Sequence, residues 1–105
     1  MTDTTLGGYT AVHGRAAAFE GSDGQPYTAA AEVEHEGSAE QPWAAYLVFL
    51  RWAESGGAIM GHLETENLAD GDSESEVREA VDALPLQRVR ALLDEAIARK
   101  ARDFE

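Results

Sequence analysis

Apolar and polar residues alternate through the first two-thirds of the chain and then change to a helical spacing. The clearest alternation runs over residues 27–36, where Tyr27, Ala29, Ala31 and Val33 share one face and mostly glutamate and threonine lie between them. This pattern is typical of a half-buried antiparallel strand. The segment before it, residues 9–20, is a further strand candidate. Its glycines favour a strand, although three consecutive alanines leave a helix open.

Two more strands are expected after the loop that follows residue 36. Residues 43–53 are apolar on both faces, which is typical of a central strand. The sequence Glu-Ser-Gly-Gly at 54–57 predicts a tight hairpin turn, and residues 58–66 then form the fourth strand. Residues 1–8 carry no periodicity and are expected to form a flexible lead.

Helical spacing begins after a loop at residues 67–72. Ser73 and Glu76 fit a capping box, and apolar residues then recur every three or four positions up to Leu84. Pro85 ends this helix and is well placed to start another. The second helix has one apolar stripe, which consists of Leu86, Val89, Leu92, Leu93, Ala96, Ile97 and Phe104.

The order of elements predicts the fold class. Four strands followed by two helices indicate a single α+β domain over residues 9–105. We expect a two-layer structure, a four-stranded antiparallel meander (β-β-β-β-α-α) with the two C-terminal helices packed on one face of the sheet.

A tight turn at 54–57 pairs even residues of the third strand with odd residues of the fourth. One predicted face is free of charge and is expected to lie beneath the helices; it holds Tyr46, Val48, Leu50, Trp52, Ile59, Gly61 and Leu63. The other face mixes apolar and charged groups and has no element left to cover it. Its residues, the predicted interaction surface, are Trp43, Leu47, Phe49, Arg51, Met60, His62, Glu64 and Glu66.

The charge of the chain restricts its partners. Twenty acidic residues against eight basic ones give a net charge of −12, which repels nucleic acid and anionic membranes. Two explanations of the acidity remain open, a high-salt cytoplasm and a GC-rich genome. No cysteine is present, no leader is visible at the N-terminus, and no apolar run is long enough to span a membrane, so a cytoplasmic protein is expected.

Candidate chemistry is sparse. His62, Glu64 and Glu66 point the same way along one strand and are weak candidates for a metal site, but strand alternation alone explains their spacing. The acidic loop around Asp70 lacks the glycine position of a calcium-binding loop. Motifs for a nucleophile or a phosphate loop are absent, so no cofactor is expected.

These observations predict a non-enzymatic interaction or regulatory module that uses the outer face of its sheet. The partner is another protein or a second copy of the chain. One alternative is a small-ligand-binding domain with a pocket between sheet and helices around Tyr46, Trp52 and Leu63. The other is a metal-dependent enzyme centred on His62, Glu64 and Glu66.

Overall fold

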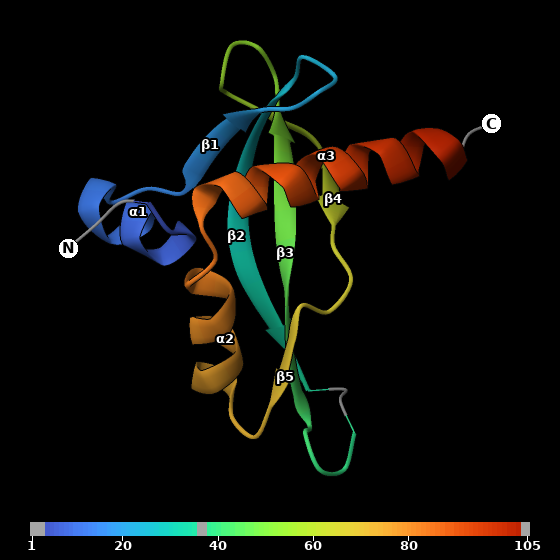
Figure 1. Ribbon diagram of the computed structural model, residues 1–105. Helices are drawn as coiled ribbons and strands as arrows, with labels where there is room; N and C mark the ends of the chain where they lie inside the picture. Colours follow the sequence, from blue (N-terminus) through green and yellow to red (C-terminus); the bar gives the residue numbers. More distant parts are fainter. Residues whose placement is uncertain (1–3, 36–37, 104–105) are drawn as a thin grey trace.

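The fold is an antiparallel sheet with helices on one face (Figure 1). The computed structural model describes residues 4–35 and 38–103. Its elements are α1 (Leu6–His13), β1 (Ala17–Glu20), β2 (Pro26–Glu34), β3 (Trp43–Trp52), β4 (Ile59–Glu64), β5 (Ala69–Gly71), α2 (Glu74–Asp82) and α3 (Leu86–Asp103). The strands follow the order β1-β2-β3-β4, and β5 pairs with β3. The predicted α+β fold, with its meander and two C-terminal helices, is confirmed.

The core lies between the sheet and the helices. Leu47 and Phe49 of β3 and Val89 and Leu93 of α3 have no exposed surface, and Val77 of α2 is 1% exposed. Burial of each such side chain stabilises the fold by roughly 1.5–3 kcal/mol. Figure 1 shows α3 lying across β2, β3 and β4, with α2 beside them. The core therefore joins both C-terminal helices to one face of the sheet.

The first helix corrects two predictions. Residues 9–20 were expected to form one strand and residues 1–8 a flexible lead, but α1 covers Leu6–His13 and only Ala17–Glu20 is a strand. The Thr5 hydroxyl caps the helix by accepting from the Gly8 N–H at 3.0 Å, and Leu6 is 2% exposed. Gly7 allows close packing here, because a Cβ at this position would lie 2.8 Å from Cβ of Asp82. Residues 1–3 lie outside the described part of the chain.

The N-terminal segment is also joined to the junction between α2 and α3. The Leu6 N–H donates to the Leu84 carbonyl at 3.0 Å, and the Leu86 N–H donates to the Thr4 carbonyl at 2.8 Å. These two bonds span an isolated antiparallel bridge between Thr5 and Pro85. Such a long-range pairing leaves no local periodicity in the sequence, so it was not predicted.

Helix α2 starts where the capping-box pattern predicted. Ser73 is the N-cap, and its hydroxyl accepts from the Glu76 N–H at 3.2 Å. The Glu76 carboxylate accepts in turn from the N–H of Asp72, one residue before the cap. The loop predicted at 67–72 differs in one respect, because Ala69–Gly71 forms β5 on β3.

The assignment of the two sheet faces was wrong for β3. Trp52 pairs with Ile59, as the tight turn requires, but the next pair is Arg51 with Gly61, so Met60 is an extra residue in β4. Beyond this β-bulge, odd residues of β3 lie opposite odd residues of β4. Phe49 thus shares its face with Leu63, which packs against the core, and because Leu47 and Phe49 have no exposed surface they cannot form an outer surface.

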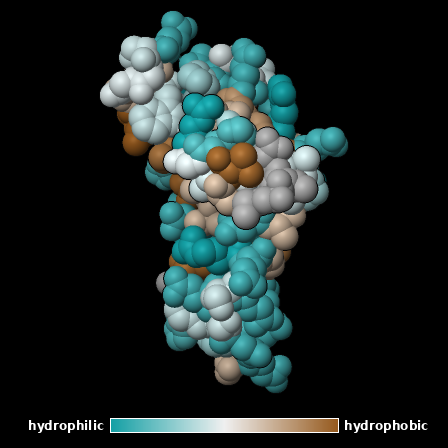
Figure 2. Space-filling model, turned by 90° about the vertical axis from the view of Figure 1, so that its left-hand side faces the viewer, coloured by the Kyte–Doolittle hydropathy of each residue, from teal (hydrophilic) through white to brown (hydrophobic). Residues whose placement is uncertain are grey.

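None of the helices in the described ranges is both long and apolar enough to cross a membrane. The side of the molecule seen in Figure 2 is mostly hydrophilic, with small separate apolar areas. This surface matches the excess of carboxylates in the sequence.

Candidate functional site

The outer face of the sheet is the side that α2 and α3 leave open. The strand registers place Leu50 between Thr28 of β2 and His62 of β4, and Val48 between Ala30 and Glu64. The large apolar side chains at the centre of this face come from β3, and Ile59 of β4, which pairs with Trp52, adds a 54% exposed one at the end of the hairpin. The side chains from β3 are Tyr46, Val48, Leu50 and Trp52, and each is half-buried by its neighbours on the sheet.

The outer face is hollowed along β1, β2 and β3. The hollow has a volume of about 570 Å³ and reaches from Ala18 across Thr28 and Ala30 to Leu50 and Trp52. Its floor is held in place by a hydrogen bond, because the indole N–H of Trp52 donates to Oγ1 of Thr28 at 2.9 Å.

The charged groups of this face form a rim. Glu20, Glu32, Glu34 and Glu64 lie on it by strand alternation, and Arg15 lines one end of the hollow. Nε2 of His62 lies 3.8 Å from Oε1 of Glu64, and 63% and 53% of these two side chains are exposed. An apolar centre is therefore surrounded mainly by carboxylates.

The eight residues predicted to form the interaction surface are separated by the fold. Leu47 and Phe49 are buried, Trp43 packs against the core with its ring T-shaped to that of His35, and Arg51 lies on the helix side of the sheet. His62 and Glu64 do lie on the outer face. Met60 is 58% exposed at the bulge, and Glu66 lies beyond the end of β4.

The structure adds the residues that sequence analysis assigned to the core. Tyr46, Val48, Leu50 and Trp52 were placed beneath the helices because they carry no charge, and this placement was wrong. The signal that could have found them is in β2, whose apolar residues pair with the odd residues of β3. The three residues named for the predicted ligand pocket, Tyr46, Trp52 and Leu63, do not line one space, since Leu63 lies on the opposite side of the sheet from the other two.

The metal hypothesis gains no geometric support. Within residues 4–35 and 38–103, no group of three or more histidine, aspartate or glutamate side chains gathers closely enough to hold a metal ion. The three histidines lie on α1, directly after β2 and on β4. Asp70 lies in β5, and the acidic residues that follow it lie at the N-terminus of α2.

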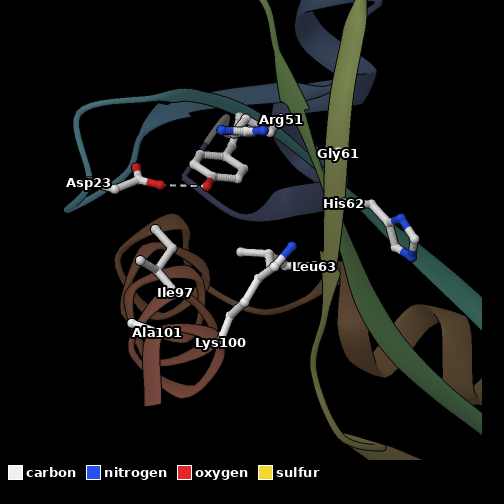
Figure 3. A pocket seen from close by; sticks show the side chains of 9 residues that line it. Asp23, Arg51, Gly61, His62, Leu63, Ile97, Lys100 and Ala101 are labelled. Atoms are coloured by element: carbon white, nitrogen blue, oxygen red, sulfur yellow. Dashed lines mark hydrogen bonds between the residues drawn. The ribbon is translucent and has the colours of Figure 1, made fainter. Parts of the chain in front are cut away.

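A second concave site lies on the helix side of the sheet. It has a volume of about 340 Å³ and is bounded by the β1–β2 turn, the bulged ends of β3 and β4, and the C-terminal half of α3 (Figure 3). The phenol of Tyr27, 3% exposed, donates to Oδ2 of Asp23 at 2.7 Å. Burial, together with the bond to the Asp23 carboxylate, raises the pKa of Tyr27 to about 12.

Comparison with protein families, with curated proteins and with solved structures gives no match to this chain.

Proposed function

We propose that this protein is a small interaction module that binds a partner protein on the outer face of its sheet. The observation that carries the proposal is that no helix within residues 4–35 and 38–103 lies over one whole face, which has Tyr46, Val48, Leu50 and Trp52 at its centre. Contiguous apolar surface of this kind commonly marks an interface.

The shape of the hollow favours a helix as the bound segment. The hollow crosses three strands, and two strand spacings of about 4.8 Å make it roughly 10 Å wide. An α-helix with its side chains is about 10–12 Å across. An amphipathic helix placed along the hollow would set its apolar stripe on Val48, Leu50 and Trp52.

The charge of the rim favours a basic partner over a second copy. A face-to-face dimer would bring Glu32, Glu34 and Glu64 of both copies to one interface, and each copy has a net charge of −12. Lysine or arginine residues flanking the apolar stripe of the partner would instead complement the rim and speed association. We therefore propose a basic amphipathic helix as the ligand of this face.

The proposal can be tested with a synthetic helical peptide that carries leucines on one stripe and lysines elsewhere. Amide shifts in the ¹⁵N-labelled protein should change saturably around Ala30, Val48 and Leu50. A control peptide, in which serine replaces each leucine at the same charge, should produce only weak, non-saturable shifts. The variant Leu50→Glu should abolish saturable binding, whereas Glu79→Gln, on exposed α2 surface, should preserve it.

Two results would overturn the proposal. One is equal binding of the leucine and serine peptides, because attraction to net charge alone would then explain the shifts. The other is a stable dimer, found by light scattering, that Leu50→Glu dissociates. In that case the outer face belongs to a second copy of the chain.

A further inference from the structure

The pocket on the helix side is independent of the outer face and has a preformed wall. The β1–β2 turn is fixed to α3, because the Ser22 N–H donates to Oδ1 of Asp94 at 3.0 Å. Gly21 allows this close approach, since a Cβ there would lie 2.7 Å from Cδ1 of Ile97 and 2.8 Å from Cε1 of Tyr27. Both carboxylate oxygens of Asp23 are already engaged, by the Gln25 N–H and the Tyr27 hydroxyl.

Two cations face this pocket without a close carboxylate partner. Figure 3 shows Lys100 extending from α3 toward β4, with Arg51 on the opposite side of the space and His62 pointing away from it. The Arg51 guanidinium donates one bond, from Nη2 to the Met60 carbonyl at 3.2 Å. Among the residues that the structure describes, neither cation has a carboxylate oxygen within 4.0 Å. What distinguishes these two cations from the other basic residues is that both line the same concave site.

Gly61 keeps the pocket open. It lies inside β4, where glycine weakens a strand, and it pairs with Arg51 across the bulge. A Cβ at Gly61 would meet only the Arg51 guanidinium, at 3.7 and 3.8 Å, which is ordinary contact. Packing within the protein therefore does not require glycine. A glycine inside a strand marks a β-bulge, as here beside Met60, or the close approach of a ligand, and the missing side chain leaves space in this pocket.

We propose that this pocket binds a small organic anion. Its acid group, a carboxylate or a phosphate, lies between Arg51 and Lys100, and its apolar body lies against Leu63, Ile97 and Ala101. Arginine and lysine form strong charge-assisted hydrogen bonds with both kinds of acid group. The volume of about 340 Å³ is at the lower end of the range for small-molecule sites, so the ligand is small.

The test uses three probes of similar size: benzoate, phenyl phosphate and neutral benzyl alcohol. Each is titrated into the ¹⁵N-labelled full-length chain at constant ionic strength, so that general screening does not change. The amides of Gly61 and Leu63 should shift saturably with at least one anion, and the tighter anion identifies the acid group. Benzyl alcohol should bind at least about tenfold more weakly, as should either anion to Lys100→Gln.

Two further variants separate the pocket from the general surface. Arg99→Gln removes a positive charge from the neighbouring exposed position, which does not line the pocket, and should leave anion binding unchanged. Gly61→Val should fill the pocket and abolish binding while the chain remains folded. The proposal is overturned if no anion gives saturable shifts, if Lys100→Gln binds as tightly as the wild type, or if benzyl alcohol binds as tightly as benzoate.

Discussion

The hydroxyl of Tyr27 donates to the Asp23 carboxylate at 2.7 Å, and this bond joins β2 to the turn that precedes it. Tyr27→Phe should lower the free energy of unfolding by about 1–2 kcal/mol, the usual effect of removing a hydrogen bond to a charged group that is partly solvated. Urea unfolding at neutral pH measures this change. No loss of stability would mean that the bond contributes nothing in solution.

Because of the same tyrosine, the folded protein should lose stability in alkaline solution. Burial raises the pKa of Tyr27 from 10.0 to about 12, so the folded state favours the neutral phenol. The stabilisation is complete below the unfolded pKa of about 10 and is lost as the pH rises through the folded value. An absorbance titration should show a tyrosinate step near pH 12 that is absent from Tyr27→Phe. The prediction fails if this substitution instead removes amplitude near pH 10.

Asp82 should give the same direction of pH dependence at a lower pH. Burial raises the pKa of its carboxyl group, an effect that Arg78 partly offsets. Asp82 is also the last residue of α2, where the helix dipole disfavours negative charge. Because the folded pKa lies above the unfolded value, its contribution to stability is present below the unfolded pKa and is lost as the pH rises through the folded pKa.

Asp82→Asn should therefore melt at a higher temperature than the wild type at pH 7, and the difference should shrink as the pH approaches 3.8. Glu79→Gln, on the exposed surface of the same helix, removes an equal charge and serves as the control. If both substitutions raise the melting temperature equally, the effect comes from net charge and not from the position of Asp82.

Phe49 and Leu50 are neighbours in β3 that face opposite sides of the sheet. Phe49 has no exposed surface, so Phe49→Ala should cost about 3–5 kcal/mol through lost burial and cavity formation. Leu50 is only half-buried on the outer face, so Leu50→Ala should cost about 1 kcal/mol. Denaturant unfolding of both variants tests the face assignment, and equal losses would contradict it.

Salt should stabilise the chain. Among the described residues, Arg78 and Glu74 form a solvent-exposed ion pair at 3.8 Å, and His62 lies 3.8 Å from Glu64, a contact that is an ion pair only when the imidazole is protonated. Most of the net charge of −12 therefore lacks a close partner and repels itself. The screening length falls from about 10 Å to about 3 Å between 0.1 and 1 M salt, so the urea midpoint should rise over this range of KCl. A flat midpoint would leave a GC-rich genome as the explanation of the acidity.

The sequence predicted the elements whose periodicity is local. The alternation in β2, the cap at Ser73 and the apolar stripe of α3 up to Ile97 all depend on neighbouring residues, and each was correctly interpreted. Phe104, the last residue of the predicted stripe, lies outside the described part of the chain. The helix α1 was missed because its glycines suggested a strand, whereas Gly7 serves contact with Asp82 from another element. The short strand β5 depends on pairing with β3 and has no pattern of its own.

The candidate sites were harder to predict because β3 is apolar on both faces. Freedom from charge is a poor guide to burial in such a strand: Arg51 lies at the end of the core face, and Leu50 and Trp52 lie outside. The pocket between Arg51 and Lys100 joins residues 49 positions apart, which no local pattern reveals. Its one local signal was the glycine inside β4.

The extra residue in β4 gives the hairpin between β3 and β4 a particular evolutionary constraint. Side chains at the tip are exposed, so many substitutions there would have little effect on folding. An inserted or deleted residue would instead turn one strand over relative to the other and exchange its inward and outward side chains. In this segment length is more tightly constrained than composition, and natural variants should differ there by substitution far more often than by gaps.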